Sequence, residues 1–385
     1  MIREVSRQIK ERTTSPEDVV KSCLERIQTL NPVVNAFITV LSDEALAQAA
    51  AAEAELAAGR WRGPLHGIPV GIKDFYDTAG VRTTAAFEHF KNRVPQKDAV
   101  AVRQLKDAGA ILIGKTNMHT LGMGTTGLES AFGPVKNPRN NAYIPGGSSS
   151  GSAAAVATGM CLATLDTDAI GSCRLPSACC GVVGFKGTYG LISAQGVLEG
   201  EGPPDETIVW LAHPGITTRS ALDTALVLET FGVASDSDHG PLRIGVANNI
   251  TVDKEIEAAF GAAVDLFRRS GHTLKSVAAP LVDMSRGIEN IERDREVVAA
   301  DVFGEIDVIL LPTTTTTVPT VAQAKGKPQA LSPHLTLFAN YYGLPAVSVP
   351  CGSDSKGLPL GLQIVGRPRE DGIVLRIAQE YERGC

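Results

Sequence analysis

The stretch PGGSSSGSAAAVATG, residues 145–159, places three consecutive serines between glycines and follows them at once with an alanine-rich run. Glycine permits tight backbone turns and alanine is the strongest helix former, so the stretch predicts a tight loop that enters a helix. Hydroxyls on such a loop are consistent with a linker, with an anion cradle at a helix N-terminus, or with part of a hydrolase site. The rest of the chain is needed to decide among these three.

A second serine in a comparable setting is Ser172, in the segment LDTDAIGSCRLPSACCG of residues 165–181. It follows a short apolar run and precedes a helix-forming run, and Gly171 permits a tight turn between them. A serine at a helix N-terminus lies among exposed backbone N–H groups, so a nucleophile and an oxyanion hole can coexist there. The two serine segments together favour a hydrolase site.

A serine nucleophile needs a base, and the sequence offers a lysine more readily than a histidine. None of the seven histidines lies in a glycine-rich, motif-like turn, which disfavours a Ser-His-Asp triad. Lys73 follows the apolar run GIPVGI, which predicts a buried strand that holds the amine in a low-dielectric site. Because burial favours a neutral amine, Lys73 is the candidate base.

Helices alternate with short apolar runs along the whole chain. Ser15 predicts the N-cap of an amphipathic helix over residues 16–30, and a helix followed by an apolar strand is predicted in residues 99–117 and 253–277. This alternation predicts an α/β fold with a covered, mixed sheet. No polar linker rich in proline and glycine divides the chain, so we expect a single domain over residues 1–385.

The composition is that of an ordinary globular protein, with 43% apolar and 20% charged residues. The net charge of −6 provides no global basic field, so we expect no nucleic acid and no membrane as a partner. Residues 1–20 carry charges throughout and lack the apolar core of a signal peptide. The longest nearly uncharged helical run, residues 152–165, is too short to span a bilayer, and we expect a cytoplasmic protein.

Sequence patterns for metals and cofactors are missing. The seven cysteines include no Cys-x-x-Cys pair, which indicates reduced structural thiols. The histidines are scattered and form no H-x-x-x-H or H-E-x-x-H pair. We therefore expect neither a metal ion nor a flavin, nicotinamide or nucleotide cofactor.

Blocks of sequence over nearly the whole chain resemble the amidase signature family. The glycine-serine stretch and the turn around Ser172 are two of these blocks, and their order along the chain is specific to the family. The full set is GPLHGIPVGIKDFYDTAG, GAILIGKTNM, NPRNNAYIPGGSS, GGSSSGSAAAVATG, DTDAIGSCRLPSACCGVVGFKGTYG, DVILLPTTT and GLPAVSVPCG…GLPLGLQIVGRP.

The resemblance implies a Ser-cisSer-Lys triad at three positions of this sequence. Lys73 matches the family lysine, Ser148 the first serine of the glycine-serine loop, and Ser172 the nucleophile. It also implies a cis peptide bond between Gly147 and Ser148. The loop would then hold a serine that relays a proton between the nucleophile and the lysine.

The resemblance further implies the groups that receive the substrate. The developing oxyanion is expected to meet the backbone N–H groups of Ala169, Ile170, Gly171 and Ser172. Gly122 aligns with a loop that lines the acyl site in relatives.

Departures from the family pattern are concentrated before the nucleophile. Ala169 and Ile170 stand where the family has a threonine-like residue and a glycine, and Asp166 stands where it has a glycine. Ile170 is β-branched and therefore disfavours any backbone conformation with positive φ. Cys173 replaces an aliphatic residue. The backbone donors survive these changes, but the substrate is harder to infer.

For the fold, the resemblance implies one large α/β domain with a central mixed, mostly parallel twisted sheet, covered by helices on both faces. Its catalytic core spans about residues 62–200 and its C-terminal core spans 306–385. A substrate-pocket region at about 270–305 is shorter than in the family. Relatives are often homodimers, so a homodimer is a further expectation.

These residues predict an amidase that cleaves the C–N bond of a small carboxamide, aryl amide or ureide-like substrate. Two other interpretations stay open. One is the glutaminase subunit of a tRNA-dependent amidotransferase, which shares the triad and needs a partner subunit. The other is a degenerate, non-catalytic scaffold, suggested by the changes at Ala169 and Ile170 and by the shortened pocket region.

Overall fold

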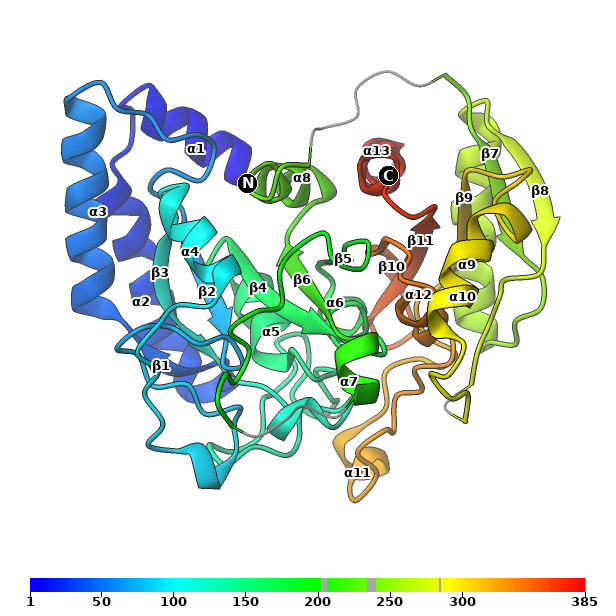
Figure 1. Ribbon diagram of the computed structural model, residues 1–385, viewed down its shortest axis with the longest axis horizontal. Coiled ribbons are helices and arrows are strands. Elements are labelled where there is room, and N and C mark those ends of the chain that lie inside the picture. Colours follow the sequence, from blue (N-terminus) through cyan, green and yellow to red (C-terminus); the bar gives the residue numbers. More distant parts are fainter. Residues whose placement is uncertain (202–205, 234–239, 284, 385) are drawn as a thin grey trace.

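A single mixed sheet of 11 strands runs through the computed structural model, which describes residues 1–385 except 202–205, 234–239, 284 and 385. The strands lie in the order β1-β3-β2-β4-β6-β5-β10-β11-β9-β7-β8 (Figure 1). Their bounds are β1 Phe37–Val40, β2 Pro69–Lys73, β3 Ile111–Thr116, β4 Ala163–Asp168, β5 Val183–Lys186, β6 His213–Thr218, β7 Arg243–Ala247, β8 Thr273–Val277, β9 Val308–Pro312, β10 Ala346–Ser353 and β11 Pro359–Gly366.

The α/β class and the mixed sheet are confirmed, but the sheet is not mostly parallel. Among the described strands, β2 pairs in parallel with β3 and β4, and β7 with β8 and β9. The other six pairings are antiparallel. The reason is connection length: the short turn between β10 and β11 permits only a hairpin, whereas a parallel pair needs a crossover such as the helix between β7 and β8.

Helices cover both faces of the sheet, and β3 shows how the sequence separates them. Ile111 and Ile113 pack in one apolar cluster with α2 and α5, whereas Leu112 belongs to the cluster on the opposite face. The helices are α1 Ile2–Lys10, α2 Pro16–Val34, α3 Ser42–Ala57, α4 Val100–Asp107, α5 Ser150–Thr158, α6 Arg174–Cys180, α7 Glu206–Leu211, α8 Ala221–Glu229, α9 Lys254–Arg269, α10 Ile291–Asp301, α11 Val321–Ala324, α12 Leu337–Tyr341 and α13 Asp371–Gly384, with 3-10 turns η1 Glu88–Phe90 and η2 Thr120–Gly122.

Local sequence signals account for several helix boundaries. Ser15 caps α2 as predicted: its hydroxyl accepts from the backbone N–H of Asp18 at 3.0 Å, and the Asp18 carboxylate accepts from the N–H of Ser15. The predicted helix-then-strand units are α4 followed by β3 and α9 followed by β8. Among the described residues, none of the helices combines the length and the hydropathy that a membrane crossing requires.

The packing of α5 against the sheet brings the glycine-serine loop to the ends of β2 and β4. At Gly151, near the start of α5, an added Cβ would lie 2.4 Å from the carbonyl oxygens of Ala36 and Asn117. The N–H of Gly151 donates to Asn117 O at 2.9 Å. Glycine is therefore required here because the helix approaches the neighbouring backbone too closely for any side chain.

This contact predicts opposite effects for two helical glycine-to-alanine changes. Gly151→Ala should lower the free energy of unfolding by about 1–3 kcal/mol, since the methyl group overpacks the α5 contact. Gly261→Ala, in α9 with nothing within 4 Å of its added Cβ, should raise it by about 0.5–1 kcal/mol. Urea unfolding of both variants measures the difference. Equal effects would contradict the close approach of α5.

Candidate active site

Lys73 is the last residue of β2 and its side chain is completely buried. The Nζ atom donates to Ser148 Oγ at 2.7 Å and to Thr167 Oγ1 at 2.8 Å. Burial lowers the pKa of Lys73 from its usual 10.5 to about 8, although the negative charge of Asp166 opposes this shift. Near pH 8 about half of the molecules therefore carry a neutral amine beside the Ser148 hydroxyl.

The glycine-serine loop crosses the ends of β2 and β4. The peptide bond between Gly147 and Ser148 is cis, as the resemblance implied. Ser148 O accepts from the N–H of His119 at 3.0 Å, and the N–H of Ser149 donates to Ser172 O at 3.0 Å. These backbone bonds connect the Ser148 loop both to the segment after β3 and to the turn that carries Ser172.

The Ser172 turn is built around the carboxylate of Asp168 at the end of β4. This carboxylate accepts from the backbone N–H groups of Gly171 at 2.7 Å and Cys173 at 3.2 Å. The expectation that Gly171 offers its N–H to an oxyanion is therefore wrong for this conformation, because Asp168 already occupies that donor. The N–H groups of Ala169, Ile170 and Ser172 donate to no other described residue.

Ile170 fits the turn because the positive φ falls on its neighbour. Gly171 has φ +126°, and an added Cβ there would lie 2.4 Å from Thr336 Oγ1. Ile170 is not among the residues with positive φ, and its carbonyl accepts from Thr336 Oγ1 at 2.5 Å. The β-branched side chain is thus compatible with a turn whose unusual conformation is taken entirely by glycine.

Arg174 and Asp168 form a fully buried ion pair under the Ser172 turn. Nε and Nη2 of Arg174 contact the two carboxylate oxygens at 3.0 and 2.9 Å. Burial disfavours the charged carboxylate, but the guanidinium prevails and holds the pKa of Asp168 well below its usual range. Arg174 also donates to Asn340 Oδ1 and Gln363 Oε1, both at 2.6 Å, so α12 and β11 support the turn.

Ser148 and Ser172 lie in adjoining segments, yet no hydrogen bond joins their hydroxyls among the residues that the structure describes. Catalytic hydrogen bonds are often long or poorly aligned before substrate binds. Gly122 borders the same place: an added Cβ would lie 3.7 Å from Ser148 Oγ and 2.7 Å from the ring of Phe75. The next residue, Met123, is 62% exposed.

Other reactive side chains near the turn are held in unreactive states. Burial raises the pKa of the Cys173 thiol well above its usual value, and its Sγ contacts Thr217 Oγ1 at 3.4 Å. Burial lowers the pKa of His119, whose ring lies by Thr126 and Glu129 rather than at Ser172. The six cysteines within the described part are unpaired and buried. Over that same part, His, Cys, Asp and Glu side chains form no group that could hold a metal ion.

Sequence reasoning missed several residues that support the site: Thr167, His119, Asn340 and Gln363. Thr167 stands inside a block that matches the family, but nothing in its context marked the side chain as a ligand of Lys73. Gln363 was detectable, because it is a polar residue within the apolar run GLPLGLQIVG. Asn340 carries no such signal, and only the packing of α12 brings it to Asp168.

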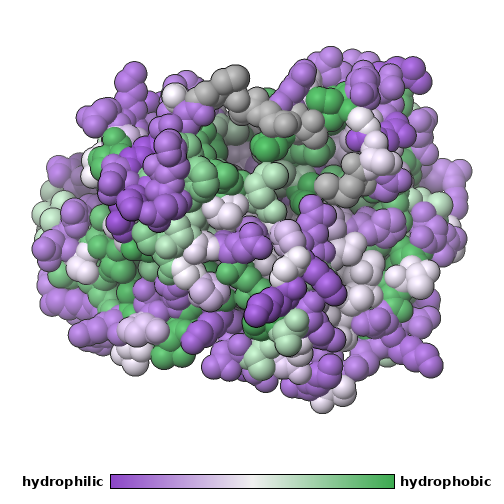
Figure 2. Space-filling model, turned by 90° about the horizontal axis from the view of Figure 1, so that it is seen from below, coloured by the Kyte–Doolittle hydropathy of each residue, from purple (hydrophilic) through white to green (hydrophobic). Residues whose placement is uncertain are grey.

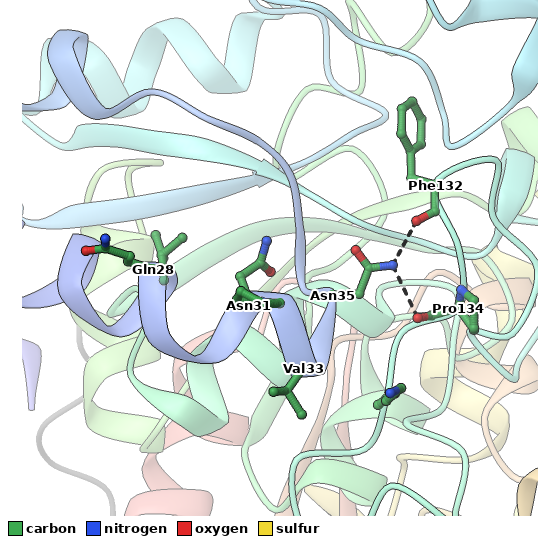
Figure 3. Close-up of a pocket in the computed structure, with 9 residues that line it drawn as sticks. Gln28, Asn31, Val33, Asn35, Phe132 and Pro134 are labelled. Carbon is green, nitrogen blue, oxygen red and sulfur yellow. Dashed lines mark hydrogen bonds between the residues drawn. The ribbon is translucent and has the colours of Figure 1, made fainter.

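The loops after β2 and β4 lie in the lower half of Figure 1, and Figure 2 shows the molecule from below, with hydrophilic side chains around patches of apolar ones. A surface pocket elsewhere is lined by the end of α2 and residues 132–136 (Figure 3). Asn35 closes one side of it by donating to Phe132 O at 2.9 Å. Lys73, Ser148 and Ser172 do not line this pocket.

Comparison with known proteins agrees with this geometry. The family model described as Amidase matches residues 18–289 and 283–375. The chain belongs to the amidase signature family, and it is a hydrolase that acts on amide C–N bonds.

Similar proteins include curated and solved examples. A glutamyl-tRNA(Gln) amidotransferase subunit of Geobacter metallireducens is 32% identical over 475 aligned residues, covering 99% of this chain and 96% of the relative. An amidase crystal structure is 28% identical with a TM-score of 0.84 and covers 99% of this chain and 98% of its own. The structure of the corresponding amidotransferase subunit from Thermotoga maritima is 29% identical, with a TM-score of 0.77 and coverages of 96% and 91%.

The ion pair under the turn generates a stability prediction. Arg174→Met should lower the free energy of unfolding by about 3–5 kcal/mol, because the Asp168 charge remains buried without its cation. The double variant Asp168→Asn with Arg174→Met should lose less than the single one, since no uncompensated charge remains. Urea unfolding at pH 7 measures both. A single variant that loses under about 1 kcal/mol would show that the pair does not hold the turn.

Proposed function

We propose that this protein hydrolyses a small amide through an acyl-enzyme on Ser172, with Ser148 and Lys73 as a proton relay. The observation that carries the proposal is the 2.7 Å hydrogen bond between the buried Lys73 amine and Ser148 Oγ. A buried lysine whose pKa is lowered to about 8 can accept a proton near physiological pH, which a surface lysine cannot.

The proposed reaction proceeds in two halves. Neutral Lys73 takes the proton of Ser148, Ser148 takes that of Ser172, and Ser172 Oγ attacks the amide carbonyl. The oxyanion meets free backbone N–H groups of the turn, for which Ala169, Ile170 and Ser172 are the available donors. The proton returns through Ser148 to the leaving amine, and water then hydrolyses the ester by the same relay in reverse. Each oxyanion donor contributes about 2.7–4 kcal/mol to such a reaction.

The substrate proposed is a small carboxamide, aryl amide or ureide-like compound. The second candidate is the glutaminase subunit of a tRNA-dependent amidotransferase, favoured by the similarity to amidotransferase subunits in Geobacter metallireducens and a Roseiflexus species. The two differ in what they need: a free amidase turns over alone, whereas the amidotransferase role requires glutamine and a partner subunit. Ammonia release by the purified chain, assayed over a panel of primary amides, anilides, ureides and glutamine, separates them.

Replacement of the proposed nucleophile should abolish catalysis without unfolding the protein. In Ser172→Ala, turnover and labelling by a serine-directed fluorophosphonate should both be lost, because the attacking oxygen is gone. The melting temperature should change little, because the Ser172 hydroxyl makes no hydrogen bond to a described residue. Ser22→Ala, on α2 and away from Lys73, is the control that keeps labelling. Residual activity above about a tenth of wild type would exclude Ser172.

The proposed base predicts a pH dependence. Protonated Lys73 is inactive and neutral Lys73 is active, so labelling by fluorophosphonate should rise with pH and reach half its maximum near pH 8. Lys73→Ala should lose activity together with this limb. Lys73→Arg should not restore it, because a guanidinium does not deprotonate in proteins. An unchanged pH profile in either variant would exclude Lys73 as the base.

A further inference from the structure

A second buried titratable group lies beside Lys73 and has no part in the proposed relay. Asp166 belongs to β4 and is completely buried. In the parallel pairing of β2 with β4, Ile72 is opposite Leu165, so the next residues along the strands, Lys73 and Asp166, are neighbours. Their side chains start on the same face, because an added Cβ at Gly71 would lie 3.1 Å from Thr164 Cγ2 and side chains repeat at every second residue.

The Asp166 carboxyl is held by hydroxyl groups from two strands. Thr164 Oγ1 on β4 and Thr217 Oγ1 on β6 each donate to Oδ2 at 2.7 Å. Oδ1 makes no hydrogen bond to a described residue, although the Ser152 hydroxyl lies close enough to affect the titration. The backbone carbonyl of Asp166 accepts from the Tyr76 hydroxyl at 2.7 Å. Two donors on one oxygen stabilise an ionised carboxylate in a fixed position.

The surrounding titratable groups leave Asp166 as the charge that faces Lys73. Burial raises the pKa of Tyr76, Cys161 and Cys173 well above their usual values, so these groups are neutral. Burial lowers the pKa of His119 on the other side of Lys73, so this ring is neutral as well. Asp168 is charged but paired with Arg174.

The state of the pair depends on two opposing effects. Burial raises the pKa of the Asp166 carboxyl, while the Ser152 hydroxyl and the positive charge of Lys73 lower it. An ionised Asp166 favours protonated Lys73, and removal of that charge favours the neutral amine.

We propose that Asp166 is a positioning residue for the base: its fixed carboxylate retains the proton on Lys73 and so raises the pH at which the enzyme becomes active. This inference rests on the proposed role of Lys73. It also gives a physical consequence to a departure noted in the sequence, since the family resemblance implies glycine at this position. The carboxylate acts through Lys73 and does not touch the reacting atoms.

The test is the pH dependence of fluorophosphonate labelling in Asp166→Asn, whose side-chain oxygen can still accept from both threonines. The ascending limb should move to lower pH by about 1 unit, which at 1 unit below the wild-type midpoint gives about a fivefold faster labelling. The control is Glu382→Gln, which removes another carboxyl whose pKa burial raises, to about 7, on α13. Its profile should match wild type.

Every outcome of this test bears on the proposal. An unmoved limb, or one that moves to higher pH, would overturn the role of Asp166 even where Lys73→Ala is inactive as expected. A limb that persists in Lys73→Ala would overturn the proposed base instead, so the two failures are distinguishable. If Asp166→Asn does not fold, Asp166→Gly removes the same charge, and its limb should also move to lower pH.

Discussion

The buried ion pair between Asp168 and Arg174 is the interaction on which the arrangement of the site depends. Each charge alone would be very costly in the interior, so the two residues are stable there only together and with further hydrogen bonds. Those bonds come from distant parts of the chain, through Asn340 on α12 and Gln363 on β11. The C-terminal part of the chain is therefore needed to fix the turn of Ser172, which otherwise belongs to the segment between β4 and α6.

Burial alone does not make a lysine a catalytic base, as a comparison of Lys73 with Lys115 shows. Burial lowers the pKa of both to about 8. Lys115, on β3, donates to Tyr76 O at 2.6 Å and to Thr83 Oγ1 at 2.7 Å and has the Asp74 carboxylate at 3.8 Å. These partners hold its proton in a structural network. Lys73 instead meets Ser148, and the contact with a serine of the cis peptide loop distinguishes the candidate base from a buried structural cation.

The parts of the structure that depend on local chemistry could be predicted from the sequence, and those that depend on packing could not. The N-cap at Ser15 and the burial of Lys73 follow from neighbouring residues, and both are as expected. The antiparallel majority of the sheet depends on strand order, which no local pattern determines. The N–H of Gly171 looked available because the preceding sequence does not reveal that the Asp168 side chain turns back to accept it.

The departures at Ile170 and in the shortened region bear on specificity rather than on chemistry. Gly171 takes the positive φ, so the backbone of the turn tolerates Ile170, and what changes is the side chain beside the nucleophile. That side chain packs against the apolar cluster that includes Trp210 and Phe338. The alignment with the Geobacter relative spans 475 residues although this chain has 385, and the two matched family ranges meet at residues 283–289. Because these residues lie inside the region 270–305 that we expect to be shortened, less chain is available to build the acyl pocket, and Ile170 fills space next to it. A substrate must therefore be selected by a pocket of different shape, while the relay of Lys73 and Ser148 does not depend on that region.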